Sequence, residues 1–432
     1  MSDTPINPPE PLVATPGRRA VLSWCLFDWA NSPFATVVVT FVFAVYFKDA
    51  IVGDEVRATA LWGYALSVSA LAVAVLGPIL GSVADAGARR KPWLFACSAV
   101  MVVACAALWF ATPDAGSIWL VLILVGIGNL GFELGMVFYN AMLPGLAPAD
   151  RMGRLSGWAW GLGYAGGLAC LVVALFGFIQ VDTPPFGLDP ETAEPVRAIA
   201  ILVAAWFVLF AWPLFAFTPD LGGERRGFFI ALRLGLVTLG RTLRSIRDHR
   251  TIARFLLARM LYIDGLNTLF AFGGLYAAGT FGMDLAEVLY FAVALNVAAG
   301  IGAFGFGWID DWLGSKRTLI MSLVALIIVG ALILIVEDKV WFWILGLGIG
   351  IFMGPTQAAS RSMMARLAPV ERQTEMFGLF ALSGKATAFL GPWLVALLTM
   401  SSGSQRIGMS VVLVFFAAGL AIIIGVREPG RE

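Results

Sequence analysis

The sequence predicts an all-α membrane protein in which twelve transmembrane helices form two pseudo-symmetric six-helix bundles. Three features support this: an apolar composition, twelve apolar stretches of membrane-spanning length, and an internal repeat. Hydrophobic residues make up 59% of the 432 residues and charged residues only 13%. A water-soluble protein of this size would need more polar surface. We therefore expect a lipid bilayer around the protein.

The apolar stretches divide into two groups of six. A hydrocarbon core of about 30 Å takes roughly 20 residues of helix. The predicted spans are 21–47, 59–84, 93–111, 117–142, 154–180 and 196–217, then 251–280, 285–309, 318–336, 340–366, 374–400 and 406–426. The expected bundles are thus 21–217 and 251–426, with tails at 1–20 and 427–432 and a linker at 218–250.

The distribution of basic residues predicts the orientation. Of the 29 Lys and Arg residues, twenty fall in segments on the side of the N-terminus and five in the opposite loops. Because Lys and Arg accumulate in cytoplasmic loops, both termini are expected in the cytoplasm. The inner (plasma) membrane is the expected location. The overall charge of +1 gives no reason to expect a nucleic-acid partner.

The linker has a basic pattern of its own. Arg241, Arg244, Arg247 and Arg250 recur at helical spacing. They are consistent with an amphipathic helix on the anionic inner leaflet, or equally with a solvated linker.

The two halves share a sequence pattern. Leu146, Pro148, Arg151 and Gly157 are matched 221 residues later by Leu367, Pro369, Arg372 and Gly378. The first helices of the halves also agree, since Asp28, Asn31 and Ser32 correspond to Asp264, Asn267 and Thr268. Parallel repeats of this kind predict a twofold axis along the membrane normal and a solute cavity between the halves.

A loop pattern follows the second predicted span and returns after the eighth. It contains Gly81, Asp85, Arg89 and Arg90 in the first copy and Gly307, Asp311, Gly314 and Lys316 in the second. The pattern resembles the signature loops of the major facilitator superfamily. The resemblance implies that Asp85, Arg89, Arg90, Asp311 and Lys316 belong to loops that switch conformation.

Three further stretches resemble the vacuole-effluxer-like branch of that superfamily. They are the first-helix segment from Ser23 to Thr36, the segment from Phe138 to Pro144, and Gln357 to Ser362 with the downstream residues Phe377, Gly378 and Ser383 to Lys385. This resemblance implies efflux of amino acids as an expected function. It also implies that the first, fourth, seventh and tenth helices line the cavity.

Polar side chains at membrane depth are candidate functional residues because they are costly there. The candidates for substrate binding or coupling are Asp28, Asn31, Glu133, Tyr139, Asn140, Asp264, Asn267, Gln357, Arg361 and Lys385. Glu133, Asp264 and Lys385 fall near the midplane. Asp28, Arg259 and Arg361 fall closer to the inner interface, where long basic side chains can reach the headgroups. An alternative role for Asp28 and Arg361 is a structural ion pair that holds the halves together.

Charge counting suggests how transport is driven. Asp28, Glu133 and Asp264 outnumber Arg361 and Lys385 by one, which favours a proton on Glu133 or Asp264. Cofactors and metals are not expected: the four cysteines show no metal-ligand spacing, no nucleotide-binding loop is found, and Gly161, Gly163 and Gly166 are expected to pack helices.

The leading interpretation is therefore a secondary active transporter, not an enzyme, that moves a small solute by alternating access. An amino acid or similar zwitterion is the favoured substrate, because the expected cavity holds both acids and bases. The alternatives are an exporter of amphipathic compounds, peptide fragments or lipids, and a non-transporting sensor or scaffold. Membrane lipids are expected partners, protons are a candidate coupling ion, and the protein is expected to be a monomer.

Overall fold

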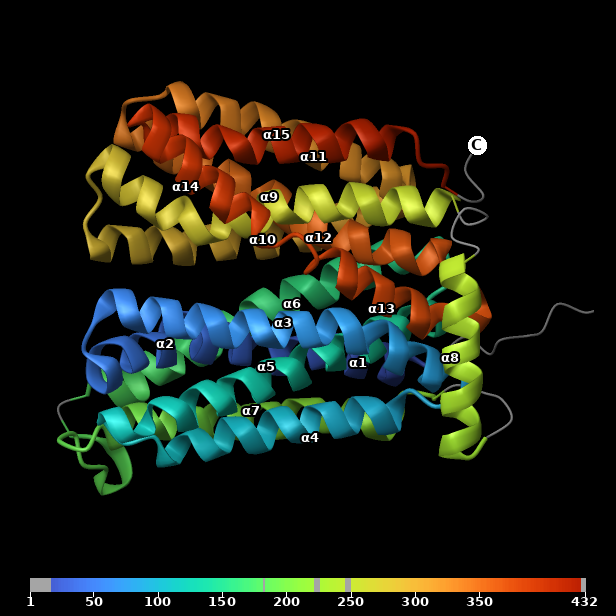
Figure 1. Cartoon of the computed structure of the whole chain (residues 1–432), viewed down its shortest axis with the longest axis horizontal. Coiled ribbons are helices and arrows are strands. Elements are labelled where there is room, and N and C mark those ends of the chain that lie inside the picture. The colour runs from blue at the N-terminus through green and yellow to red at the C-terminus, as the bar shows by residue number, and fades with distance from the viewer. Residues whose placement is uncertain (1–16, 182, 221–225, 245–249, 429–432) are drawn as a thin grey trace, which may run out of the picture.

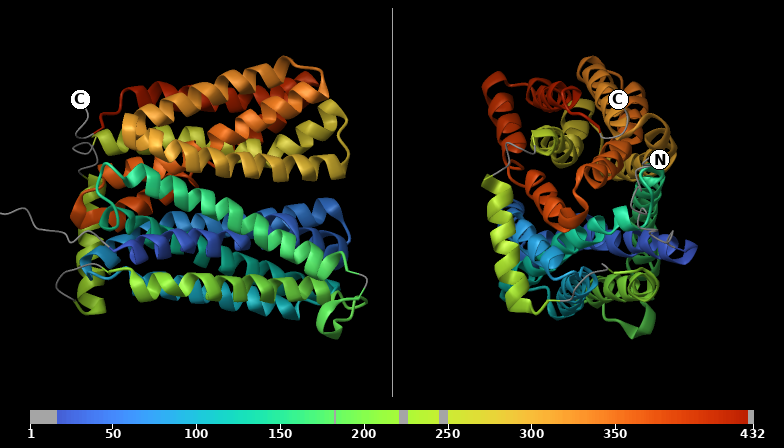
Figure 2. Two further views of the ribbon diagram at one scale, coloured as in Figure 1. Left: turned by 180° about the vertical axis from the view of Figure 1, so that it is seen from behind. Right: turned by 90° about the vertical axis from the view of Figure 1, so that its right-hand side faces the viewer.

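The computed structural model describes residues 17–181, 183–220, 226–244 and 250–428, which form an all-helical protein. Most helices run side by side along the long axis, whereas α8 (Phe228–Arg244) crosses their ends (Figure 1). The first and last described residues lie at the same end as α8 (Figures 1 and 2). We call this end the terminal face.

The first half contains six spans. The first combines α1 (Arg18–Pro33), η1 (Phe34–Phe41), α2 (Phe43–Tyr46) and η2 (Phe47–Val52). The others are α3 (Glu55–Ala86), α4 (Lys91–Ala107) with η3 (Leu108–Phe110), α5 (Ile118–Ala141) between η4 (Ala115–Ser117) and η5 (Leu143–Gly145), α6 (Met152–Ala174) with η6 (Leu175–Ile179), and α7 (Glu194–Phe217) after η7 (Pro185–Gly187).

The second half repeats this order. Its helices are α9 (Arg250–Phe281), α10 (Leu285–Leu313), α11 (Ser315–Ile335), α12 (Lys339–Leu367), η8 (Val370–Arg372), α13 (Gln373–Ser383), α14 (Leu390–Ser402) and α15 (Gln405–Ile424). Within the described residues, eleven helices are long and apolar enough to cross a membrane, and α14 is a shorter apolar helix. With α13 and α14 together forming one crossing, the twelve-span prediction holds.

The eleventh span differs from its prediction as a continuous helix over 374–400. Residues 384–389 form turns between α13 and α14. Pro392 lies in the first turn of α14, where the backbone N–H groups have no partner within the helix and the lack of one costs little. Because proline cannot donate to a preceding turn, α14 does not continue back into α13. Arg259 of α9 donates to the carbonyl of Phe380 at 2.5 Å and to Ser383 Oγ at 2.8 Å. It therefore provides hydrogen-bond donors at the C-terminal end of α13. The break places Lys385 in a non-helical segment at membrane depth.

The linker is helical over a different range from the one its arginines suggest. The helix α8 begins at Phe228 and ends at Arg244, and α9 starts at Arg250. Arg241 and Arg244 lie in the last turn of α8, whereas Arg247 lies outside the described residues. Apolar residues, rather than the basic repeat alone, therefore define this helix.

The sequence repeat corresponds to reciprocal packing between the halves. Gly157 of α6 faces α10, where an added Cβ would lie 2.3 Å from the carbonyl of Ala303. Gly378, its counterpart in α13, faces α3, where an added Cβ would lie 2.5 Å from the carbonyl of Gly77. Glycine at these positions allows the backbones to approach closely. Each half thus packs its fifth span against the second span of the other half.

The halves also repeat a helix cap on the terminal face. Asp220, after the sixth span, accepts from the backbone N–H groups of Arg90 and Lys91 at the start of α4. Glu428, after the twelfth span, accepts from those of Ser315 and Lys316 at the start of α11. A carboxylate at a helix N-terminus satisfies free N–H groups and complements the helix dipole.

Candidate functional site

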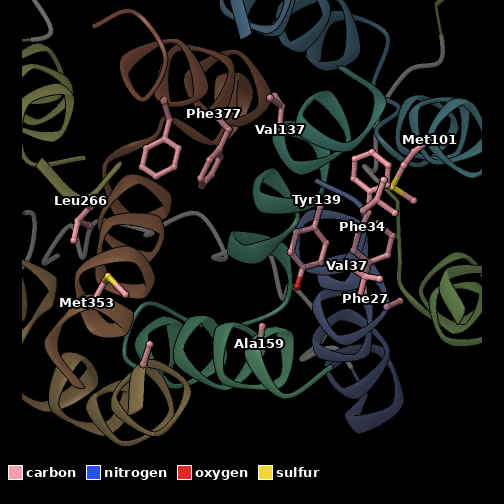
Figure 3. Packing of buried hydrophobic residues seen from close by; sticks show 14 of the residues in the cluster. Phe27, Phe34, Val37, Met101, Val137, Tyr139, Ala159, Leu266, Met353 and Phe377 are labelled. Atoms are coloured by element: carbon pink, nitrogen blue, oxygen red, sulfur yellow. The ribbon is translucent and has the colours of Figure 1, made fainter. Parts of the chain in front are cut away.

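A cavity of about 250 Å³ lies between the two halves. Its walls come from α5 and α6 of the first half and from α9, α12, α13 and the break after α13 in the second. Buried residues from both halves surround this region in Figure 3, among them Val137 on α5, Leu266 on α9 and Phe377 on α13. Six of the ten predicted site residues line the cavity: Glu133, Asn140, Asn267, Gln357, Arg361 and Lys385.

Glu133 and Lys385 form an ion pair across the cavity. Lys385 Nζ lies 2.7 Å from Glu133 Oε1, and the two side chains retain 27% and 23% of their exposure. The pair therefore joins the halves while remaining accessible from the cavity. Because Lys385 follows the end of α13, its backbone is not held in a continuous helix.

Arg259 also lines the cavity, next to Lys385 and Glu133. Besides capping α13, its guanidinium carbon lies 3.4 Å from the ring centroid of Phe380. The side chain thus points into the cavity and does not use the route to the lipid headgroups that its depth in the span would allow. Its face could have been read from the sequence, since Arg259, Ile263 and Asn267 are four residues apart.

The inward position of Arg259 changes the charge count. Asp28, Glu133 and Asp264 are matched by Arg259, Arg361 and Lys385, so the predicted excess of one negative charge is absent. Of the charged groups that line the cavity itself, three are basic and only Glu133 is acidic. Because Arg361 is paired with Asp28 and Lys385 with Glu133, Arg259 supplies the additional positive charge that could attract an anionic group of a ligand.

Arg361 of α12 is buried within contacts from the first half. Its Nη1 lies 2.9 Å from Asp28 Oδ2 and 3.3 Å from Asn140 Oδ1, and its Nε and Nη2 donate to the hydroxyl and carbonyl of Ser156. The guanidinium also lies 4.9 Å from the ring centroid of Trp24. The geometry therefore matches the structural alternative, an ion pair that joins the halves.

Three predicted residues lie outside the cavity lining, on or beside α1. Asp28 forms an ion pair with Arg361. The amide nitrogen of Asn31 lies 3.2 Å from Met136 Sδ. Tyr139 stacks on Trp24, donates to its carbonyl at 2.9 Å and is fully buried. These contacts give Asn31 and Tyr139 a packing role within the first half.

Asp264 also lies outside the lining, on a flank of α9. It is 2% exposed, and within the described residues neither carboxylate oxygen has a close hydrogen bond, although the Thr387 side chain lies near enough to interact with it. The backbone carbonyl of Asp264 and the hydroxyl of Thr268 face Gly391 near the start of α14. A buried carboxylate thus lies close to the interrupted span, where Thr387 belongs to the turns between α13 and α14.

Polar contacts close the terminal face between the halves. Asp85 of α3 accepts from the hydroxyl of Thr374 and the N–H of Glu375 at the start of α13. Arg90 donates to Asp85, Thr374 and Gln373. This network joins the first predicted switch loop to the second half.

The second switch loop makes the reciprocal contact. Asp311 of α10 accepts from the N–H of Gly153 and from Arg154 Nε, at 2.8 and 2.6 Å, at the start of α6. Arg89 is exposed, and Lys316 contributes its backbone N–H to Glu428. Arg154 and Thr374 are partners that the loop pattern alone did not reveal, because they come from the opposite half.

A second cavity, of about 280 Å³, lies farther from the terminal face. It shares two helix surfaces with the first: Phe270 follows Asn267 by one turn on α9, and Met353 precedes Gln357 by one turn on α12. These steps correspond to about 5 Å along each helix. Its lining includes Phe41, Phe270 and Phe291. The first cavity, with its charged lining, is therefore followed by a second cavity, the apolar chamber, whose lining is largely apolar.

No group of three or more His, Cys, Asp or Glu side chains suited to a metal ion occurs in the described part of the chain.

The chain is similar to known transporters over most of its length. A family model described as "Vacuole effluxer Atg22 like" matches residues 49–429. The chain belongs to this family.

Two relatives of the Atg22-like chain illustrate its range. It is 30% identical over 413 residues to the uncharacterized MFS-type transporter YxiO of Bacillus subtilis (strain 168), covering 94% of each protein. It is 21% identical to Autophagy-related protein 22 of Coccidioides immitis (strain RS), covering 88% of this chain and 75% of that protein.

Solved structures support the fold of the Atg22-like chain. The major facilitator transporter FucP in its outward conformation superposes with a TM-score of 0.74 at 14% identity, over 95% of this chain and 98% of that one. The predicted major facilitator fold is thus confirmed. The chain is a multi-pass membrane transporter of this superfamily and not an enzyme.

Proposed function

We propose that this protein is a secondary active transporter that moves a small zwitterion, with a neutral amino acid as the best candidate, by alternating access between the two halves. The observation that carries this proposal is the accessible Glu133–Lys385 pair in a cavity shared by both halves. Arg259 and Lys385 are placed to receive a carboxylate, and Glu133 to receive an ammonium group.

Alternating access is supported by where the halves touch. The hydrogen bonds that join them in the described part of the chain lie at the cavity or between it and the terminal face. The Asp85 and Asp311 networks both lie between the cavity and the terminal face. A closed terminal face with a cavity behind it is the geometry of one end state. Separation of these contacts would open the other side.

The terminal face is proposed to be cytoplasmic, in the plasma membrane, because it carries most of the Lys and Arg residues. The proposed direction is efflux, following the family description. The protein is proposed to act as a monomer, because the two halves of a single chain suffice to form both walls of the cavity.

The proposed coupling ion is a proton, carried by Asp264 in preference to Glu133. In the described part of the chain the Asp264 carboxylate is buried without an ion pair, whereas Glu133 is already neutralised by Lys385. An ionised carboxylate without a partner is costly in such surroundings. Movement of the break between α13 and α14 would alter those surroundings during transport.

A second candidate is export of amphipathic compounds, including peptide fragments or lipids. The apolar chamber beyond Asn267 and Gln357 favours substrates that combine a charged group with an apolar group. Amino acids with apolar side chains fit both candidates. The charged cavity opposes a scaffold role, for which an apolar interior would be more stable.

The test is transport by the purified protein in liposomes. Radiolabelled leucine, lysine and a zwitterionic amphiphile should be offered separately to liposomes loaded with the same unlabelled compound. Leucine exchange that is lost in Lys385→Met supports the proposal. Exchange of the amphiphile alone would favour the second candidate, and exchange of none of the three would contradict this substrate class.

A further inference from the structure

The helix α8 crosses the terminal face at its margin and lies across the ends of the spans (Figures 1 and 2). Its inner face is formed by Ala231, Gly235, Leu239 and Thr242, which are buried at successive helical turns. An added Cβ on Gly235 would lie 2.8 Å from the backbone nitrogen of Val83. The helix is therefore firmly docked on the end of α3.

The same helix also reaches the second half. Arg372, in the turn before α13, donates to Thr242 Oγ1 at 3.3 Å. The helix thus contacts both partners of the α3–α13 interface that closes the terminal face.

The outer face of α8 has no counterpart within the described chain. Phe229 is 82% exposed and Ile230 58%, and Leu234 and Val237 are also exposed. Arg233 and Arg244 are exposed on the same helix, and Phe228–Arg244 contains no acidic residue. The combination of exposed large apolar groups and arginines does not suit contact with water alone.

We propose that the outer face of α8 is a binding surface for anionic phospholipids of the leaflet at the terminal face. In this arrangement, Phe229, Ile230 and Val237 enter the acyl-chain boundary, and the arginines contact the lipid phosphates. The proposal depends on the membrane-spanning fold and not on the substrate, the coupling ion or the direction of transport.

Three observations favour lipid over a protein partner. First, α8 lies parallel to the expected membrane surface and at its level, because the spans end there (Figure 1). Second, its position at the margin leaves the outer face continuous with the lipid-facing sides of the spans (Figure 2). Third, α8 carries the exposed residues Arg233 and Arg244 and no acidic residue, a charge pattern complementary to the phosphates of anionic lipids. Interfacial helices combine these features.

The depth of α8 can be measured with nitroxide labels on the full chain in lipid nanodiscs. Ile230→Cys and Val237→Cys should carry the label in a background without the native cysteines. Glu191→Cys, in an exposed loop at the opposite face, is the control. In nanodiscs that contain phosphatidylglycerol, the α8 labels should collide more with oxygen than with a water-soluble nickel chelate, and the control label should show the reverse. A nickel preference at both α8 sites would overturn the proposal.

The role of charge is tested with matched pairs of arginines. Arg233→Gln with Arg244→Gln should lower the retention of phosphatidylglycerol relative to phosphatidylcholine by about threefold, measured by mass spectrometry of purified protein with its lipids. Arg89→Gln with Arg317→Gln removes two exposed arginines elsewhere on the terminal face and should have little effect. Equal losses in the two pairs, or no loss in the α8 pair, would contradict specific binding by α8.

Discussion

Arg361 Nη1 lies 2.9 Å from Asp28 Oδ2, and this contact inserts a buried cation of the second half among groups of the first. Both side chains are almost fully buried, so removal of one partner leaves the other charge uncompensated. We expect Arg361→Gln to lower the free energy of unfolding by about 3–5 kcal/mol. The double variant with Asp28→Asn should be more stable than Arg361→Gln alone. Thermal unfolding in detergent measures both effects, and equal stability of the single and double variants would show that the two charges are not coupled.

The partly exposed ion pair of Lys385 and Glu133 should respond differently to removal of one partner. Lys385→Met should reduce substrate exchange at least about tenfold, because it removes a binding partner, while unfolding should change by only about 1 kcal/mol. Glu133 can still be solvated from the cavity. Arg254→Met removes an exposed basic residue from α9 and is the control. A large loss of stability with unchanged exchange by the remaining folded protein would assign Lys385 a structural role.

Closure of the terminal face depends on a glycine with no space for a side chain. An added Cβ on Gly81 would lie 2.4 Å from the carbonyl of Thr374, whereas Gly63, in the same helix, has nothing within 4 Å. We therefore expect Gly81→Val to separate α3 from α13 and to favour a state open at the terminal face. Gly63→Val should have no such effect. Spin-label distances between the terminal ends of α3 and α13 test this, and unchanged distances in Gly81→Val would refute it.

The proposed orientation can be tested by labelling. A cysteine at Glu191 should react with an impermeant maleimide added to intact cells, and one at Arg244 only after permeabilisation. This expectation follows from the excess of basic residues on the terminal face. Reaction of the Arg244→Cys protein in intact cells would reverse the assignment of the faces.

The proton proposal predicts a specific loss of coupling. With the membrane potential clamped, an imposed pH gradient should drive transport by the unmodified protein. Asp264→Asn should abolish that response but retain exchange, because Asp264 does not line the cavity. Glu191→Gln, in the exposed loop, should respond normally. Transport by the unmodified protein that ignores the gradient would exclude protons as the coupling ion.

The sequence predicts the spans well wherever apolar length decides the structure. It does not predict the break after α13, because Gly384 and Lys385 interrupt the apolar run only briefly. The turn depends on Pro392 and on capping by Arg259 from another helix. The sequence prediction also underestimates α8, since the mainly apolar stretch Phe228–Val237, which contains Arg233, precedes Arg241 and Arg244.

The cavity is predicted in part for a similar reason. Helical faces identify Glu133, Asn267 and Gln357, whose neighbours along the chain lie on the same surface. The choice of partners among three acids and three bases depends on packing between helices. Ser156 illustrates this, because its hydroxyl and carbonyl help to hold Arg361 but nothing in its local sequence indicates that role.

The paired caps formed by Asp220 and Glu428 make each half self-contained. In each half, the acidic residue after the sixth span accepts a hydrogen bond from the N-terminus of the third span. The end of the half is thus bound to its own third span without a contribution from the other half. The connection between the halves, which includes α8, adds its own contacts with α3 and with Arg372 of the second half. We therefore expect two separately translated polypeptides, divided between α8 and α9, to keep both caps and the hydrogen bonds described above between the halves.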